Sequence, residues 1–254
     1  MTETPPAVSA QLPEARTSSL RRVRTLWSLW RREKLDPMPF YRALAAELAA
    51  DLEQRHGSLQ DRVLLDLGCG PGAYTDALRA RGARVTAVDN DPTALEVDGA
   101  RVADALVADA SALPLPDASV DGVVCSNLLE HTPDPEAVLL EIARVLRPGG
   151  FAYVSWTNWY SPWGGHEFVP YQYLGPRFGP RLHHRLHGPV RKNAYGDELW
   201  YTHIGRILRF LRGLDTLQID LVEPRYWPRL RFIVAIPGVR EIFTWNCVIH
   251  AHRR

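Results

Sequence analysis

The 254-residue chain is poor in cysteine, and its three cysteines, Cys69, Cys125 and Cys247, stand far apart. An odd number of widely spaced cysteines argues against a disulfide framework and favours a reducing compartment such as the cytoplasm. No apolar run approaches the roughly 18 residues that a membrane-spanning helix requires, so we expect no transmembrane segment. The net charge is only +1, which gives no global reason to expect a nucleic acid as partner.

The beginning of the chain also lacks an apolar core segment. Residues 1–19 are rich in Pro, Ala, Ser and Thr, and we expect a disordered tail there rather than a signal peptide. Residues 20–56 are expected to form two helices, over 20–32 and 40–54. The first helix is basic and carries one apolar stripe, made of Leu20, Val23, Trp27 and Trp30. We expect this stripe to pack on the domain, and the alternative is contact with an anionic membrane surface.

The sequence is organised around a glycine-rich loop that follows an apolar run. The run ends at Asp66-Leu67, the loop is Gly68-Cys69-Gly70-Pro71-Gly72, and a helical pattern covers residues 73–81. Glycine permits a tight bend and a close approach of the backbone to a ligand. The arrangement predicts a first strand that ends in a cofactor-binding loop at the carboxyl edge of a parallel sheet.

Two classes of cofactor are open for such a loop. Residues 68–73 fit the loose dinucleotide pattern G-x-G-x-x-G/A, so a nicotinamide cofactor is one alternative. Asp66, two residues before the first glycine, favours a different class. Its carboxylate would repel a pyrophosphate and attract the ammonium group of an amino-acid moiety.

Two further acidic residues follow predicted strands. The strand over 84–88 leads into Asp89, where a carboxylate suits both hydroxyls of a ribose. The alternative is that Asp89 caps a following helix, but Asp91, which precedes a proline, fits that cap better. The strand over 105–108 leads into Asp109, for which a simple turn is the alternative.

The next part of the pattern is a buried strand, a helix and another strand. A strand over 120–126 is followed by Asn127-Leu128-Leu129-Glu130-His131 and by a helix that reaches residue 146. The segment Leu146-Arg147-Pro148-Gly149-Gly150 then turns into a strand over 151–156.

In this order, the motifs resemble those of the class I S-adenosylmethionine-dependent methyltransferases, of the type-11-like domain family, from about Arg62 to Val154. The resemblance implies an α/β, Rossmann-like fold over residues 57–254, with a seven-stranded, mostly parallel sheet and helices on both faces. It also implies that the helices of residues 20–56 form a lid over the cofactor.

The same resemblance implies S-adenosylmethionine as the cofactor. The glycine loop and Asp66 would hold its methionine part, Asp89 its ribose, and Asp109 with the Ala110 N–H its adenine. The cofactor-binding residues predicted in this way are Asp66, Gly68, Cys69, Gly70, Gly72, Asp89, Asn90, Asp109, Ala110 and Asn127.

Residues 157–203 depart from the minimal fold as a long insertion after the fifth parallel strand. The insertion is rich in Trp, Tyr and Phe, and from Phe168 to Gly196 it contains no acidic residue. We expect an aromatic and basic cap that recognises the substrate. Aromatic faces beside Arg and His donors suit a sugar, and the basic excess suits a phosphate or another anionic group.

Two histidines are candidates for a catalytic base. His131 lies where the substrate is expected, and its alternative role is to pack beside the cofactor. His166 follows two glycines and precedes Glu167, which is placed to orient it. The alternative for His166 is to fix its loop through a backbone hydrogen bond.

We expect no metal site. Some related O-methyltransferases that act on quinones carry a metal-binding E-x-x-E-H, and Asn127 stands in place of its first glutamate. His183, His184 and His187 have helical metal spacing but no carboxylate nearby, so a solvated or anion-facing helix is favoured over zinc.

Residues 217–222 and 248–252 are predicted to be the last two strands, paired antiparallel. Between them, residues 226–245 are apolar and basic together. We expect these residues to pack in a core, and a second surface that touches a membrane or lipid is the alternative.

The sequence thus predicts a cytoplasmic methyltransferase, with peripheral contact to the inner membrane face as a further option. The acceptor is expected to be a hydroxyl of a small molecule, sugar or glycolipid, methylated by in-line displacement with a histidine base. One alternative is a non-catalytic protein that binds S-adenosylmethionine. The other, less favoured, is an NAD(P)-dependent oxidoreductase. Nucleic acid is not expected as the acceptor, because no recognition motif accompanies the basic residues.

Overall fold

The computed structural model describes residues 20–30, 36–97, 100–190 and 192–254. The tail predicted for residues 1–19 lies outside this part of the chain.

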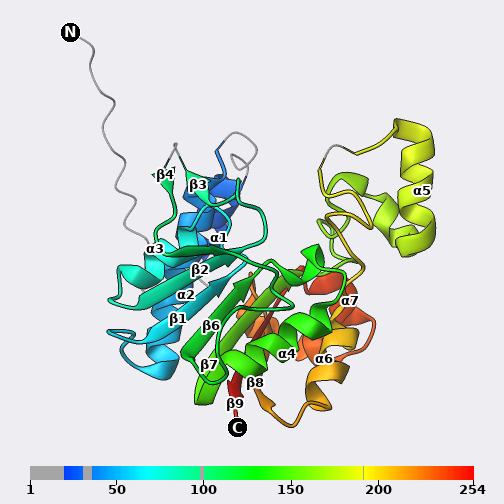
Figure 1. Cartoon of the computed structure of the whole chain (residues 1–254). Coiled ribbons are helices and arrows are strands. Elements are labelled where there is room, and N and C mark those ends of the chain that lie inside the picture. Colours follow the sequence, from blue (N-terminus) through cyan, green and yellow to red (C-terminus); the bar gives the residue numbers. More distant parts are fainter. Residues whose placement is uncertain (1–19, 31–35, 98–99, 191) are drawn as a thin grey trace.

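A seven-stranded sheet forms the centre of the molecule (Figure 1). Its strands are β1 (Val63–Leu67), β2 (Arg84–Asp89), β5 (Ala105–Val107), β6 (Val120–Ser126), β7 (Leu146–Thr157), β8 (Leu217–Pro224) and β9 (Asn246–Arg253). Their order is β5–β2–β1–β6–β7–β9–β8. The four pairs from β5 to β7 are parallel, and β9 is antiparallel to both of its neighbours. The predicted fold class is confirmed, including the antiparallel last pair.

Helices cover both faces of this sheet, as predicted (Figure 1). One face carries α1 (Leu20–Trp30), α2 (Met38–His56) and α3 (Ala73–Arg79), and the other carries α4 (Pro135–Val145) and α6 (Ile204–Arg212). The alternation of side chains along β1 supplies both cores. Leu64 joins the core of α2 and α3, whereas Leu65 and Leu67 join the core of α4 and α6. Leu64, Leu65 and Leu67 are each fully buried.

The strand order determines where a ligand can bind. From β1 the chain proceeds to β2 on one side, and β6 lies on the other side. The carboxyl ends of β1, β2, β5 and β6 therefore meet at one edge, at the point where the strand order reverses. This is the edge at which the motifs of the sequence come together.

The apolar stripe predicted for the first helix is wrong in one respect. In α1, Leu26 is only 7% exposed, whereas Trp27 is 53% exposed. Leu26 packs in the core with α2, and Leu29 packs against it on the same side of the helix. Trp27 lies about 100° around the helix from Leu26, so both cannot face the core. The side chains of Leu20, Val23 and Trp30 lie outside the described part of the chain.

The helix expected after Asp91 is also wrong. The carboxylate of Asp91 instead accepts hydrogen bonds from Thr93, from its N–H at 2.8 Å and from its hydroxyl at 2.7 Å. Turn residues follow, and then a short hairpin of β3 (Glu96–Val97) and β4 (Ala100–Arg101). In this Asp-x-Thr turn the carboxylate finds its hydrogen-bond donors within two residues. Residues that can cap a helix therefore form a turn here, and no helix follows.

The insertion over residues 157–203 forms a projecting unit with a small core of its own (Figure 1). It contains the 3₁₀ turns η2 (His166–Phe168) and η3 (Tyr171–Leu174) and the helix α5 (Gly175–His187). Trp159, Phe168 and Leu199 make the core. Near the end of the chain, η4 (Pro228–Ala235) and α7 (Val239–Phe243) connect β8 to β9, and η1 (Leu129–His131) follows β6.

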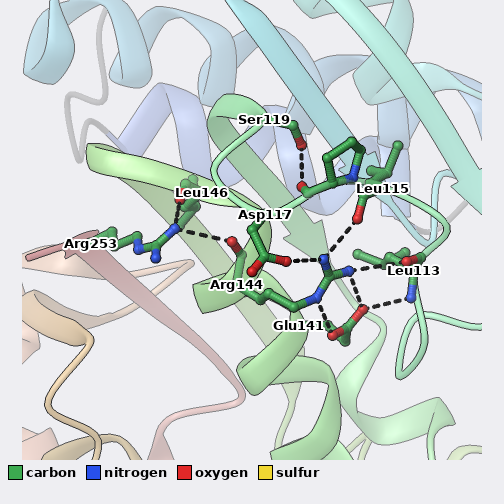
Figure 2. Close-up of polar contacts among 9 residues, drawn as sticks. Leu113, Leu115, Asp117, Ser119, Glu141, Arg144, Leu146 and Arg253 are labelled. Carbon is green, nitrogen blue, oxygen red and sulfur yellow. Dashed lines mark hydrogen bonds and ion pairs between the residues drawn. The ribbon is translucent and has the colours of Figure 1, made fainter.

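An arginine on α4 forms hydrogen bonds with the segment that follows β5 (Figure 2). The Arg144 guanidinium donates to both oxygens of Glu141, at 2.7 and 2.8 Å, and to Asp117 at 2.7 Å. It also donates to the backbone carbonyls of Leu115 at 2.7 Å and Leu113 at 3.0 Å. Glu141 in turn accepts from the Leu113 N–H at 2.7 Å. The contacts hold the strand-to-strand connection beside Asp109 against the body of the protein.

Replacing Arg144 by Met should therefore loosen this connection. We expect the free energy of unfolding of Arg144→Met to fall by about 2 kcal/mol, because several charge-assisted hydrogen bonds are lost at a partly exposed site. Denaturant unfolding measures the change. Arg209→Met, at an exposed arginine of α6, is the matched control and should be near neutral. Equal stability of both variants would contradict this role of Arg144.

Candidate functional site

The glycine loop between β1 and α3 has a left-handed backbone at alternate residues. Gly68, Gly70 and Gly72 have φ values of 73°, 48° and 80°. A Cβ atom at Gly68 would lie 3.0 Å from the side chain of Leu128, whereas no atom lies within 4 Å of that position at Gly70. The loop is closed against its neighbour at Gly68 and leaves open space at Gly70.

Asp66 is a buried carboxylate just before this loop, with only 1% of its surface exposed. Its Oδ2 accepts a hydrogen bond of 2.6 Å from the Thr75 hydroxyl in the first turns of α3. The pKa of Asp66 is raised to about 6, chiefly by burial and further by the charge of Asp89, while the hydrogen bonds from Thr75 and the charge of Arg79 oppose the rise. The carboxylate is thus short of positive charge, which the ammonium group of an amino-acid moiety would supply.

Asp89 ties the loop to the end of β2. Its Oδ2 accepts from the N–H of Gly70 at 2.8 Å, and its Oδ1 accepts from the N–H of Asp91 at 3.1 Å. A carboxylate oxygen has more than one acceptor position, so both oxygens can still take a ligand hydroxyl.

A cavity of about 530 Å³ lies at the carboxyl ends of β1, β2, β5 and β6. Its walls include six of the residues predicted from the sequence, namely Gly68, Asp89, Asn90, Asp109, Ala110 and His131. The other predicted cofactor residues, which are Asp66, Cys69, Gly70, Gly72 and Asn127, do not line it. The structure therefore gathers the ribose and adenine candidates around one cavity.

Asp109 both lines the cavity and makes a turn. Its Oδ1 accepts from the Ser111 N–H at 2.8 Å and from the Ser111 hydroxyl at 2.7 Å. The turn considered as an alternative is thus present. It leaves the second carboxylate oxygen for a ligand, so the two roles are compatible.

Asn127 and Cys69 face the protein. Asn127 has a φ of 57°, and its Oδ1 accepts from the Asn246 side chain of β9 at 2.8 Å. Cys69 is buried, and burial raises the pKa of its thiol well above the usual range. A thiol in this state is protonated and unreactive at neutral pH.

The end of the insertion forms part of the cavity wall, which the sequence did not indicate. The lining residues contributed by this segment are Lys192, Asn193, Asp197, Glu198 and Trp200. Hydrogen bonds to two backbone carbonyls attach the segment to the residues after β6. The Trp200 N–H donates to the Glu130 carbonyl at 2.8 Å, and the Thr202 hydroxyl donates to the Leu129 carbonyl at 3.2 Å.

The two histidine candidates lie against each other. Their rings meet edge to face, with centroids 5.4 Å apart. Nδ1 of His131 lies 2.7 Å from the backbone carbonyl of Glu198. A carbonyl can only accept a hydrogen bond, so Nδ1 carries the hydrogen and Nε2 of the neutral ring has a free lone pair. His131 is thus in the tautomer that a general base requires.

His166 has a different environment. Burial, together with the neighbouring His131, lowers its pKa to about 4, so the ring is neutral at pH 7. Its buried Nε2 has no hydrogen-bond partner, and its backbone φ is 46°. The Glu167 side chain is exposed, and its charge acts on His183 of α5. His166 therefore packs beside His131 as a weak base.

Glu130 anchors the first residue of the insertion. It is 2% exposed, and its Oε1 accepts from the Thr157 N–H at 2.8 Å. Burial raises the pKa of this carboxyl, while the neighbouring His131 lowers it. Both ends of the insertion are thus attached to the short turn that carries His131.

A buried arginine directly after β8 links three further elements at the same edge, and no sequence pattern indicated it. The Arg225 guanidinium donates to Tyr74 Oη at 2.6 Å, Ser126 Oγ at 3.1 Å and Ser155 Oγ at 3.4 Å. These partners belong to α3, β6 and β7, and Arg225 is only 3% exposed. No local pattern marks Arg225, because Ser126 is 99 residues away in the sequence.

Within the described ranges, no group of three or more His, Cys, Asp or Glu side chains is placed to hold a metal ion. None of the helices in those ranges combines the length and the apolarity needed to cross a bilayer.

Comparisons with known proteins agree with this geometry. A family model described as a methyltransferase domain matches residues 65–154. An uncharacterized methyltransferase of Mycobacterium ulcerans (strain Agy99) is 38% identical over 245 residues, which cover 92% of this chain and 95% of that protein. One from Mycobacteroides abscessus is also 38% identical, over 248 residues that cover 92% of this chain and 95% of that protein.

Solved structures show the same fold at low sequence identity. An S-adenosylmethionine-dependent methyltransferase from Mesorhizobium loti superposes with a TM-score of 0.53 at 22% identity, covering 80% of this chain and 96% of that one. Geranyl diphosphate C-methyltransferase from Streptomyces coelicolor A3(2) gives a TM-score of 0.53 at 18% identity, covering 85% of each chain.

The chain is a class I S-adenosylmethionine-dependent methyltransferase. It belongs to the same family as the mycobacterial methyltransferases, and its cofactor is S-adenosylmethionine rather than a dinucleotide. The buried, charge-deficient Asp66 and the open space at Gly70 fit the amino-acid end of that cofactor.

Asp66 should lower the stability of the cofactor-free protein at neutral pH. Its folded pKa of about 6 lies above the ordinary 3.8, so the penalty is small near pH 4, grows as the pH rises from 4 to 6 and is constant at higher pH. We expect Asp66→Asn to be more stable than the wild type by up to about 3 kcal/mol at pH 7.5 and equally stable near pH 4. Denaturant unfolding at both pH values measures this difference.

The same variant should bind S-adenosylhomocysteine much more weakly, because it cannot offer a negative charge to the ammonium group. Asp76→Asn, at an exposed position of α3, controls for the chemical change. A variant of Asp66 that loses stability at pH 7.5, or that binds like the wild type, would contradict the assignment.

Proposed function

We propose that the enzyme methylates a hydroxyl oxygen of a small-molecule, sugar or glycolipid acceptor, with His131 as the general base. The observation that carries this proposal is the 2.7 Å contact between His131 Nδ1 and the Glu198 carbonyl. Because this contact fixes the hydrogen on Nδ1, it leaves Nε2 able to accept a proton beside the cofactor cavity, which His131 lines.

The residues that would hold the cofactor are those of the glycine loop, with Asp66, Asp89 and Asp109. When bound, S-adenosylmethionine supplies an electrophilic methyl group on a positively charged sulfur. Nε2 of His131 would take the proton of the acceptor hydroxyl, whose oxygen would gain the methyl group as the carbon–sulfur bond breaks and S-adenosylhomocysteine is released. The protein's contribution is to orient the acceptor and to hold that proton.

His166 is proposed to position His131 rather than to act as the base. A ring with a pKa of about 4 holds a proton too weakly at neutral pH to drive deprotonation of a hydroxyl. Its edge-to-face contact instead restricts the orientation of the His131 ring. Glu167, being exposed, has no part in this proposed mechanism.

The acceptor is proposed to carry an apolar ring or chain next to its hydroxyl. A second cavity, of about 100 Å³, lies among apolar and aromatic side chains. Its lining comprises Leu26, Trp27, Phe40, Trp163, Tyr226, Trp227 and Trp245. This space is of the size that holds one small ring or a short alkyl segment.

The chain connects this aromatic cavity to the reaction edge on two sides. Tyr226 follows Arg225, whose guanidinium contacts the ends of β6 and the start of α3. Trp163 lies three residues before His166, which contacts His131. A lipid-linked or glycolipid acceptor, with a polar part near His131 and an apolar part near Trp163, suits this arrangement.

We place the enzyme in the cytoplasm. Cys69, Cys125 and Cys247 are free and buried, as suits a reducing compartment. Nucleic acid is not proposed as the acceptor, because the cofactor cavity and the aromatic cavity are lined by acidic and aromatic residues rather than by a basic groove. Basic residues of α5 line a separate cavity.

The test is methyl transfer from S-adenosylmethionine labelled with carbon-13 on the methyl group, incubated with the protein and with glycolipid and polar-metabolite extracts. We expect one product whose label resonates as an O-methyl group. In His131→Gln, the rate should fall by about a hundredfold or more, with the affinity for S-adenosylhomocysteine unchanged.

His184→Ala, at an exposed histidine of α5, is the control and should retain full activity. A label found on carbon or nitrogen would overturn O-methylation, and an unchanged rate in His131→Gln would overturn the assignment of the base.

A further inference from the structure

We propose that α5 is an interfacial helix that docks on the surface of a bilayer containing anionic lipids. This inference goes beyond the proposed methyl transfer and does not depend on it. The helix lies at the outer end of the insertion, away from the central sheet (Figure 1).

One face of α5 is fixed to the turn η3. Gly179 is buried, and a Cβ atom there would lie 2.2 Å from the Tyr171 carbonyl oxygen. The His183 ring packs edge to face on Phe168 at 5.7 Å and on Tyr171 at 5.4 Å. The Tyr171 hydroxyl lies 2.7 Å from Nε2 of His187. These contacts determine which side of the helix points outward.

The outward side exposes large apolar side chains. Phe178 is 60% exposed, Leu186 is 59% exposed, and Leu174, just before the helix, is 51% exposed. Tyr173 and Val169, in the preceding turns, are 46% and 40% exposed. A cluster of this kind on a projecting helix is costly in water and is typical of a surface that binds another apolar phase.

The charge beside these apolar side chains identifies that phase. Arg177, Arg181 and Arg185 recur at every fourth residue, and all three are exposed. Arg177 and Arg181 also line a cavity of about 510 Å³ with Val190 and Ala194. No acidic residue occurs between Phe168 and Gly196 to balance them. Arginine stems can lie along an apolar surface while their guanidinium groups reach lipid phosphates. Apolar side chains interleaved with unbalanced arginines are complementary to acyl chains beneath anionic headgroups.

A second exposed apolar surface, on η4 and α7, is less suited to anionic lipid. It exposes Phe232 at 61% and Phe243 at 57%. It carries two exposed arginines, Arg229 and Arg231, against the three of α5, and Arg240 there pairs with Glu241 at 3.1 Å. This surface supplies a matched control, since Phe232 and Phe178 are almost equally exposed.

Vesicle co-sedimentation of the full chain tests the inference without requiring turnover. One set of vesicles contains phosphatidylcholine alone, and the other contains phosphatidylcholine and phosphatidylglycerol in equal parts. We expect the protein to sediment only with the anionic vesicles, and less so at high salt. Phe178→Asp should weaken this binding at least about tenfold, while Phe232→Asp should bind like the wild type.

Replacing Arg177, Arg181 and Arg185 together by Gln should weaken binding about a hundredfold, since each basic residue near an anionic surface contributes a similar increment. The affinity of each variant for S-adenosylhomocysteine shows that its fold is intact. The inference is overturned if the protein ignores both kinds of vesicle or binds them equally. It is also overturned if Phe178→Asp binds normally, or if Phe232→Asp is impaired to the same extent.

Discussion

The site depends on a carboxylate that the fold buries without a full counter-charge. Asp66 is held in β1 by its neighbours in the sheet and by one hydroxyl from α3. Burial in this position favours the protonated acid, so the ionised form at neutral pH is a cost to the empty protein. A ligand with an ammonium group removes that cost. We propose that the same residue that lowers the stability of the free enzyme gives the site its preference for an amino-acid cofactor.

The remaining polar groups at this edge connect the reaction site to the insertion. The turn after β6 carries His131, and the insertion is attached to it at both ends, through Thr157 and Trp200. The insertion also supplies the Glu198 carbonyl that determines the tautomer of His131. A movement of the insertion would therefore change the cofactor cavity and the surroundings of His131, the proposed base, together. In our account, α5 brings this connected unit to the surface that holds the acceptor.

Local patterns in the sequence were sufficient for the fold and for one wall of the site. Strands that lead into the loop at Gly68, into Asp89 and into Asp109 are recognisable because each pattern lies within a few consecutive residues. Contacts between distant segments were not predictable in this way. His131 and Glu198 are 67 residues apart, and nothing near either residue indicates their contact. The prediction that Trp27 faces the core was wrong for a related reason, since a short helix rich in apolar residues permits more than one buried face.

The most direct test of the account is the proton balance of cofactor binding at the Asp66 site. Calorimetry of S-adenosylhomocysteine binding at pH 6, in two buffers of different ionisation enthalpy, gives the number of protons exchanged. With a pKa of about 6 in the free protein, binding to the ionised carboxylate should release about half a proton per ligand. Proton uptake, or no exchange in either buffer, would contradict the claim that this buried carboxylate meets the ammonium group of the cofactor.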